Sequence, residues 1–196
     1  ELTTFDHLAA RAGVRQSFLD PNSYIEDNTL ATANISNFCK EMSVQDLILA
    51  STSSIYGDSG ENLMVEEEDE KIKPPSVYAS TKLSGESLSK IILEDTSTNL
   101  IISRFFTVYG PFGRPDMSIL RFIHWIINEE KVQVFGDGEQ RRSFTYVKDV
   151  VDALLKMSGL EKSHTFNVGS NMTVSLNDVI KLIEEYSGKS ANIENL

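Results

Sequence analysis

Short apolar runs alternate with stretches of helical periodicity through the first half of the chain. The runs lie at residues 5–10, 46–52 and 99–106 and show little polar alternation. Such runs are typical of strands buried on both faces, as in a parallel sheet. Apolar residues recur at helical spacing between them, over residues 24–42 and 76–94. This order predicts an α/β fold with a doubly wound, Rossmann-like parallel sheet and right-handed crossovers.

The second half of the chain has a more mixed pattern after Gly110. In chain order it predicts a Pro/Gly-rich loop at 110–117, a helix at 118–130, a hairpin-like element at 131–147 around Gly136 and Gly138, a helix at 147–160, a strand at 164–170 and a helix at 174–189. Ser175 is a suitable N-cap for the last helix, because its hydroxyl can accept a hydrogen bond from a free backbone N–H.

Composition and charge narrow the classes of function. The chain has 196 residues, of which 40% are hydrophobic and 24% charged, as in folded globular proteins. A net charge of −11 argues against general nucleic-acid binding, although local arginines can still bind a small anion. The single cysteine excludes a disulfide framework, and no metal site is predicted. We see no signal peptide and no membrane span, so we expect a cytoplasmic protein without a membrane partner.

The candidate chemistry begins where the apolar run at 46–52 ends. Four hydroxyl residues, Ser51 to Ser54, follow at the carboxyl edge of the predicted sheet, where such folds bind ligands. Tyr78 and Lys82 lie four residues apart and therefore share one face of the helix at 76–94. An ammonium group beside a phenol lowers the phenol pKa and makes a base usable near neutrality. The tyrosine–lysine spacing is a weak signal alone and a stronger one beside this hydroxyl-terminated strand.

The start of the chain does not fit a complete dinucleotide-binding sheet. Such a sheet opens with a strand, a glycine-rich turn and a helix whose N-terminus holds the pyrophosphate. No such turn precedes residue 7, so we expect the first βαβ units to be missing and the chain, which begins with Glu1, to be part of a longer gene product.

Five segments resemble one family in its own order over nearly the whole chain: HLAARAGVRQS, ASTSSIYG, YASTK, RFFTVYGPFGRPDM and RSFTYVKDV. They are similar to the extended short-chain dehydrogenase/reductase family, in particular its NAD-dependent nucleotide-sugar epimerases, and most of all the UDP-glucuronate 4-epimerases. The resemblance implies NAD as cofactor, a UDP-sugar as substrate and a homodimer formed through the helix at 76–94 and the helix before it.

The resemblance also implies roles for three catalytic residues. Tyr78 would take the proton of the sugar 4-hydroxyl, Lys82 would hold the cofactor ribose and favour the phenolate, and Thr52 would orient the 4-oxygen. Dehydratases of this family carry an Asp-Glu pair directly after this hydroxyl, and UDP-glucuronate decarboxylases carry a glutamate two residues after it. Ser53 and Ser54 stand in those places, which favours epimerisation at carbon 4.

Arg114 bears on the choice of sugar. A guanidinium suits a planar carboxylate, and by resemblance Arg114 and Thr107 face the carboxylate of a uronic acid. An arginine that braces its own loop is the alternative. Further binding residues are implied in two sets. The cofactor set is His7, Ala9, Ala10, Asn28, Tyr78, Lys82 and Phe105, where His7 could equally be a packed core histidine; the substrate set is Thr52, Ser53, Thr107, Arg114, Gln133, Phe135 and Arg142.

The resemblance divides the chain into four parts. They are the C-terminal part of an NAD-binding Rossmann-like domain at 1–110, a substrate-binding segment at 111–145, a return to the Rossmann-like domain at 146–175 and a truncated substrate-domain helix at 176–196. The implied function is an NAD-dependent isomerase that converts UDP-glucuronate to UDP-galacturonate through a 4-keto sugar. The alternatives are a neutral UDP-hexose 4-epimerase and a non-catalytic fragment without the pyrophosphate-binding turn.

Overall fold

The computed structural model describes residues 2–57, 64–66 and 72–196. The chain forms two compact units. Unit 1 comprises Glu1–Phe106 and Val151–Val168, and unit 2 comprises Thr107–Val150 and Gly169–Leu196.

Unit 1 contains a parallel sheet of four strands. Their spatial order is β1 (Thr4–His7), β2 (Asp46–Thr52), β3 (Asn99–Phe105) and β8 (His164–Val168). Every residue of β2 is buried, because β2 has a strand on each side and lies inside the unit. This burial explains the apolar run without alternation and confirms the predicted parallel α/β fold.

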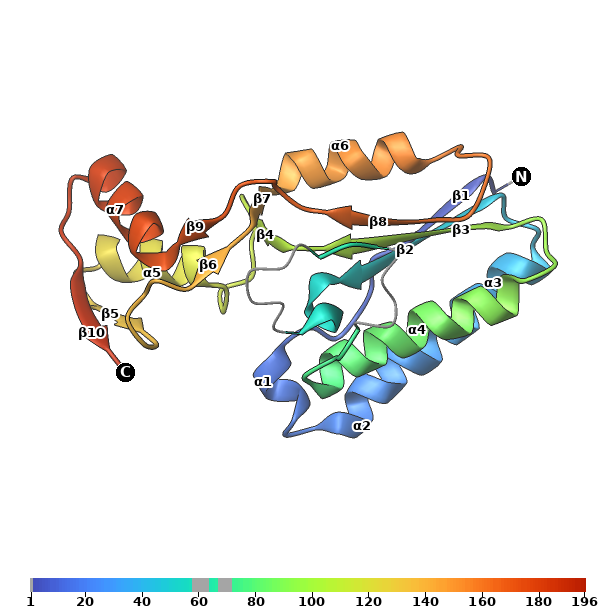
Figure 1. Cartoon of the computed structure of the whole chain (residues 1–196), viewed down its shortest axis with the longest axis horizontal. Helices are drawn as coiled ribbons and strands as arrows, with labels where there is room; N and C mark the ends of the chain where they lie inside the picture. The colour runs from blue at the N-terminus through green and yellow to red at the C-terminus, as the bar shows by residue number, and fades with distance from the viewer. Residues whose placement is uncertain (1, 58–63, 67–71) are drawn as a thin grey trace. The chain divides into compact units, whose positions relative to one another are not determined.

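Helices cover both faces of this sheet. Figure 1 shows α3 (Ala31–Glu41) and α4 (Val77–Leu93) on one face and α6 (Val147–Met157) on the other. The helix expected over 24–42 consists of two segments, the π-helical η1 (Ile25–Leu30) and the α-helix α3. Two short helices precede it, α1 (Val14–Ser17) and α2 (Pro21–Tyr24). A core of apolar side chains joins α3 and α4 to the sheet. It comprises Cys39, Val44, Leu47, Leu49, Leu93, Leu100 and Ile102.

Unit 2 is built from short strand pairs and two longer helices. Strand β4 (Thr107–Tyr109) pairs in parallel with β7 (Phe144–Tyr146), β5 (Lys131–Val134) in parallel with β10 (Asn192–Asn195), and β6 (Arg141–Arg142) antiparallel with β9 (Val174–Ser175). The helices are α5 (Ser118–Ile127) and α7 (Leu176–Ser187). Their apolar faces and strand β5 share one core, made of Phe122, Ile126, Val132, Val134, Leu176, Val179 and Ile180.

The hairpin predicted over residues 131–147 is wrong. Strand β5 pairs with β10 and strand β6 with β9, so the two arms of the expected hairpin have different partners. Gly136 and Gly138 do turn the chain, with φ angles of 74° and 76°. Core packing determines how these strands pair, because Val132 and Val134 of β5 are buried in a core shared with α5 and α7.

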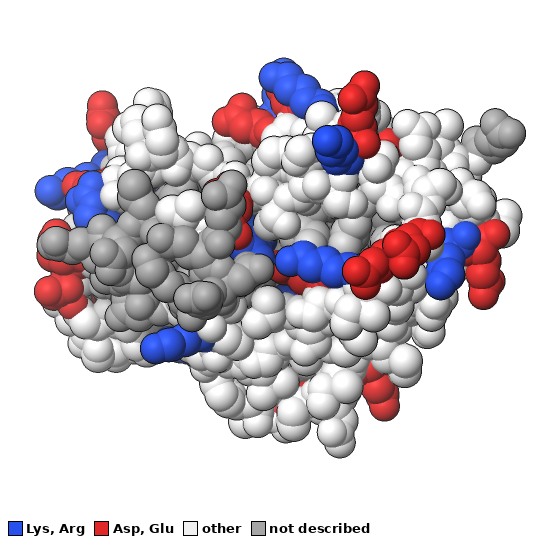
Figure 2. All heavy atoms as spheres, turned by 45° about the vertical axis from the view of Figure 1, so that its right-hand side comes forward, with Lys and Arg blue, Asp and Glu red and all other residues white. Residues whose placement is uncertain are grey.

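The surface of the described residues is mixed in charge. Figure 2 shows acidic and basic side chains interspersed over one face. Some exposed charges are paired, as where Arg11 Nε donates to Asp27 Oδ2 across 2.7 Å. Every helix within residues 2–57, 64–66 and 72–196 is too short or too polar to cross a lipid bilayer.

Helix α7 begins with the predicted cap. The Ser175 hydroxyl accepts a hydrogen bond from Asp178 N at 3.1 Å, and the Asp178 carboxylate accepts one from Ser175 N at 3.3 Å. This reciprocal capping box satisfies two backbone donors that the helix leaves free.

We expect Ser175→Ala to lower the free energy of unfolding by about 1 kcal/mol, because it leaves a helix N-terminus without its cap. Urea unfolding followed by circular dichroism measures this change. Ser187→Ala, at the other end of the same helix, is the control and should change stability by less than about 0.5 kcal/mol. Equal effects of the two substitutions would contradict the capping argument.

Candidate active site

Two hydroxyl residues at the end of β2, Ser51 and Thr52, make different contacts. Thr52 is buried, and its Oγ1 accepts a hydrogen bond from Ser54 N at 3.1 Å. This bond caps η2, a short 3-10 helix at Ser53–Tyr56. Ser51 is buried one residue earlier, and its Oγ donates to Glu86 Oε1 on α4.

Helix α4 presents the predicted tyrosine and lysine beside this strand end. The helix begins after Ser76, whose hydroxyl accepts a hydrogen bond from Ala79 N at 3.1 Å. Tyr78 therefore lies in the first turn and Lys82 one turn later. Lys82 is only 5% exposed, whereas Tyr78 is half-buried with its ring against the edge of Tyr24, 6.4 Å between centroids.

Burial changes the proton affinity of Lys82. Removal from water disfavours the ammonium form and lowers its pKa to about 8, although the Glu86 carboxylate acts in the opposite direction. The pKa of His7, at the end of β1, is lowered by burial and by the charge of Lys82. His7 Nε2 lies 3.2 Å from Thr32 Oγ1, so this imidazole is packed within the unit.

Asn28 joins the segment after β1 to helix α4. Its Nδ2 donates to Arg11 O at 3.0 Å and to Thr81 Oγ1 at 3.1 Å, while its Oδ1 accepts from Arg11 N at 2.7 Å. These contacts engage both amide hydrogens and the oxygen of a side chain that is 1% exposed. Asn28 therefore holds in place the exposed loop that contains Ala9 and Ala10.

The predicted residues of unit 1 gather at the carboxyl end of its sheet. Phe105 ends β3 directly opposite Thr52 in the β2–β3 register and is half-buried. Ser53 follows Thr52 as the first residue of η2. The sheet thus brings the ends of β1, β2 and β3 to one edge, next to the first two turns of α4.

The predicted substrate residues beyond Phe105 all belong to unit 2. Thr107 begins β4 and is half-buried, and its N–H donates to Ser143 O. Gln133 on β5 and Arg142 on β6 are exposed, as is Phe135 directly after β5. These side chains are open to solvent, as binding residues need to be.

Arg114 forms a forked ion pair within its own loop. Its Nε donates to Asp116 Oδ1 at 3.0 Å and its Nη2 donates to Asp116 Oδ2. The side chains are 45% and 58% exposed. This geometry is that of the loop-bracing alternative. An exposed pair contributes little stability, so an anionic ligand can compete with Asp116 for the guanidinium.

Sequence analysis missed a buried polar network below this edge of the sheet. Arg104 Nη2 donates to Glu86 Oε2 at 2.8 Å, and Arg104 Nη1 donates to Tyr56 Oη at 2.8 Å. The Tyr56 hydroxyl in turn donates to Asn167 Oδ1 at 2.9 Å. Two signals were visible: an arginine inside the apolar run at 99–106, and a glutamate four residues after Lys82.

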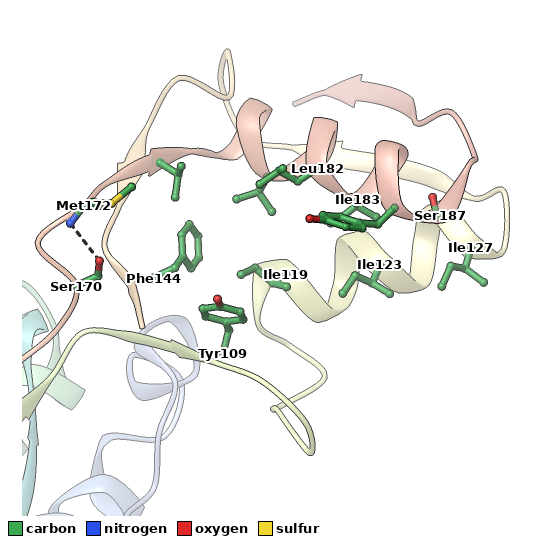
Figure 3. Close-up of a pocket in the computed structure, with 13 residues that line it drawn as sticks. Tyr109, Ile119, Ile123, Ile127, Phe144, Ser170, Met172, Leu182, Ile183 and Ser187 are labelled. Atoms are coloured by element: carbon green, nitrogen blue, oxygen red, sulfur yellow. Dashed lines mark hydrogen bonds between the residues drawn. The ribbon is translucent and has the colours of Figure 1, made fainter. Parts of the chain in front are cut away.

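An apolar pocket of about 530 Å³ lies within unit 2 (Figure 3). Isoleucines of α5 and aliphatic residues of α7 form two of its walls, and Tyr109 and Phe144 come from β4 and β7. Its lining residues include no carboxylate, amine or imidazole, and the side-chain oxygens among them are the hydroxyls of Tyr109, Ser170, Tyr186 and Ser187.

Three known proteins are similar to the chain. It is 43% identical over 194 residues to a UDP-glucuronate 4-epimerase of Thermodesulfobacterium geofontis. This match covers 97% of this chain and 58% of the relative. The structure of MoeE5 in complex with UDP-glucose and NAD superposes with a TM-score of 0.93 at 36% identity, over 99% of this chain and 65% of that one. The UDP-glucuronic acid 4-epimerase of Bacillus cereus, in complex with UDP-glucuronic acid and NAD, gives a TM-score of 0.88 at 36% identity, over 98% of this chain and 62% of that one.

These similarities agree with the resemblance inferred from the sequence motifs. The chain spans 58% of the T. geofontis relative, so it matches a part of that protein's length. Residues 3–169 also match a family described as the NAD dependent epimerase/dehydratase family. The chain therefore belongs to the NAD dependent epimerase/dehydratase family.

Proposed function

We propose that the full-length protein is an isomerase that inverts carbon 4 of a nucleotide sugar, with UDP-glucuronate and UDP-galacturonate as the exchanging pair. The observation that carries this proposal is that Tyr78 and the buried Lys82 lie on adjacent turns of α4, whose Ala79 packs in one cluster with Ile55 and Tyr56, shortly after Thr52 in the chain. The 43% identical relative named as a UDP-glucuronate 4-epimerase supports the choice of reaction and of sugar.

The residues of unit 1 fit the nicotinamide-ribose end of NAD. They lie at the carboxyl edge of a parallel sheet, where folds of this type bind dinucleotides. The exposed loop at Ala9 and Ala10 is fixed by Asn28, and the amine of Lys82 can donate to ribose hydroxyls. NAD, when bound, supplies the acceptor and donor of a hydride at the sugar carbon.

Three side chains of this chain would take part in transferring the proton of the 4-hydroxyl. Tyr78 would take it as phenolate and return it to the 4-oxygen, and the ammonium of Lys82 would stabilise that phenolate. Inversion would require the hydride to return to the opposite face of carbon 4. The Thr52 hydroxyl already accepts a hydrogen bond from Ser54 N. A hydroxyl that accepts one bond in this way can still donate its own hydrogen, here to the 4-oxygen.

The residues after Thr52 favour epimerisation over related reactions. Ser53 and Ser54 form the first turn of η2, where a carboxylate would be needed to move protons at neighbouring carbons. Without such a group, this strand end supports reversible oxidation at carbon 4 and no further elimination.

A neutral UDP-hexose is the second candidate substrate. The pairing of Arg114 with Asp116 favours it, because the guanidinium is then already engaged. MoeE5 has been solved both with UDP-glucose and with UDP-glucuronic acid, so one fold accommodates either sugar. The uronate remains our first choice because exposed ion pairs are readily exchanged.

We also propose a cytoplasmic location. Cys39, the single cysteine, is a buried free thiol, and burial raises its pKa to about 11. An unpaired and unreactive thiol fits a reducing compartment.

Tyr78→Phe should lower kcat by roughly 10²- to 10⁴-fold, because it removes the proton-transferring hydroxyl and leaves the ring in place. Proton NMR of the sugar, with UDP-glucuronate and NAD supplied, measures the turnover. Tyr186→Phe, an exposed tyrosine of unit 2, is the matched control and should leave kcat unchanged. Undiminished turnover by Tyr78→Phe would refute the proposed role, and release of CO₂ to give a pentose would show a decarboxylase instead.

Arg114→Ala should separate the two sugars. We expect kcat/KM for UDP-glucuronate to fall roughly 10- to 100-fold through loss of a charge-assisted hydrogen bond. Turnover of UDP-glucose should stay near its original value. Arg121→Ala, which removes a surface arginine stacked on Trp125, is the control. Equal losses for both sugars would indicate that Arg114 only braces its loop.

We further propose that the protein forms a homodimer through α3 and α4. Apolar side chains on these helices are exposed, including Phe38 at 40% and Ile91 at 67%. We expect Ile91→Glu to convert the dimer to a monomer, because the substitution would place a charge in an apolar interface. Size-exclusion chromatography with light scattering measures the mass. Leu155→Glu, an exposed leucine on α6 at 70%, should leave the dimer intact. A dimer that persists in Ile91→Glu would exclude this face.

A further inference from the structure

The ion pair between Glu86 and Arg104 is the most deeply buried charged contact in the described residues. Each side chain is 1% exposed. Arg104 Nε donates to Glu86 Oε1 at 3.2 Å and Arg104 Nη2 donates to Glu86 Oε2 at 2.8 Å, so the contact is a two-point fork. Ser51 Oγ donates a third hydrogen bond to Glu86 Oε1.

Stability alone is a weak reason for such a pair. Removing two charges from water is costly, and well-packed apolar residues of similar volume usually serve the core as well or better. A buried pair of this kind can instead serve to fix the positions of the segments that carry it. The forked geometry gives directional contacts that apolar packing does not supply.

Each member of the cluster adjoins a residue proposed for catalysis or cofactor binding. Glu86 is one turn after Lys82 on α4, so the two side chains share a helix face. Ser51 directly precedes Thr52 on β2. Arg104 directly precedes Phe105 on β3. The fork and the Ser51 bond thus connect the three segments that must keep their relative placement for the reaction.

We propose that Glu86 is a positioning residue: held by Arg104 and Ser51, it locks the turn of α4 that carries Lys82 to the ends of β2 and β3, and so sets Tyr78 and Lys82 against Thr52. This inference rests on the proposed function for its catalytic consequence. The structural link itself rests on the contacts of Glu86.

The effect of the Glu86 charge on the pKa of Lys82 can be measured independently of enzyme activity. Burial lowers the pKa of Lys82 to about 8, and the Glu86 carboxylate opposes this effect. Replacing Glu86 by a neutral group removes the opposition, so the Lys82 pKa falls further and the ammonium is lost at lower pH.

Other titratable groups on elements packed against α4 are distinguished by burial. The buried ones are His7 on β1, Tyr24 on α2, Cys39 on α3, Asp46 on β2, Tyr56 on η2 and Arg104 on β3, and Glu66 is partly buried beside Asn167. Arg15, Glu26, Asp27, Lys40 and Glu41 are exposed. Among these groups, His7 interacts with the charge of Lys82, as does Glu86 on α4 itself.

The test compares Glu86→Gln with Asp46→Asn in the full-length protein. Asp46 is an equally buried carboxylate at the other end of β2, where it accepts hydrogen bonds from Asn99 Nδ2 at 3.0 Å and Gly159 N at 2.9 Å. Both substitutions replace a buried carboxylate of unit 1 by an amide, on α4 in one case and on β2 in the other. Only the first removes one beside Lys82.

The first measurement needs neither cofactor nor substrate. The Cε chemical shift of Lys82, followed by carbon-13 NMR against pH, gives the midpoint of its titration. We expect this midpoint to move to lower pH in Glu86→Gln and to stay in place in Asp46→Asn. An unmoved midpoint in Glu86→Gln would overturn the inference, even if the protein turned over no sugar.

The second measurement is steady-state turnover of the UDP-sugar. A displaced Tyr78 and Lys82 should lower kcat of Glu86→Gln by roughly 10²-fold, with KM changed less, since misplacement of this kind affects the chemical step. The alkaline limb of the kcat profile should move to lower pH together with the Lys82 midpoint. An inactive wild-type protein would defeat the proposed function, whereas an active wild type with unchanged kcat in Glu86→Gln would defeat only this inference.

Two further variants separate positioning from folding. Glu86→Leu combined with Arg104→Met removes both charges and should restore thermal stability relative to Glu86→Gln. We expect kcat to remain low in this double variant, and recovery of kcat together with stability would show that the pair is merely structural. If Glu86→Gln does not fold, Ser51→Ala removes one anchor and keeps the ion pair, and there an unchanged kcat counts against the proposal.

Discussion

The parallel pairing of β2 with β3 is the constraint on which the rest of the candidate site depends. Parallel strands end at the same edge of a sheet, so Thr52 and Phe105, which lie opposite each other in register, arrive at one place. Because β2 is buried along its whole length, a shift of this register would carry apolar residues out of the core. The packing of the core therefore determines where the hydroxyl of Thr52 lies.

Helix α4 contributes the second half of the site and is held by polar contacts as well as by apolar packing. Ser76 determines where the helix begins, and Glu86 ties its third turn to the strands through Arg104 and Ser51. Lys82 lies between these two anchors and is almost fully removed from water. A lysine in this setting changes its charge within the physiological range, which an exposed lysine does not.

Unit 2 has a different physical character. Its core is apolar and its proposed substrate residues are exposed side chains on short strands and loops, of which Arg114 is paired only with a nearby exposed carboxylate. Contacts of this kind are weak individually and readily exchanged. In the proposed function, the reaction class would thus be tied to the buried part of the chain, and the choice of sugar to a few exposed groups.

The sequence by itself determined the elements that follow from local pattern. The buried strands, the helix at 76–94 and the cap at Ser175 were all predicted, because periodicity and capping depend on neighbours in the chain. The family motifs, which are contiguous segments, were likewise readable without coordinates. Only the tertiary structure decided which strands pair in unit 2, where distant segments replaced the expected hairpin. It also revealed the cluster of Glu86 and Arg104, since two charges 18 residues apart become partners only when a helix packs on a strand.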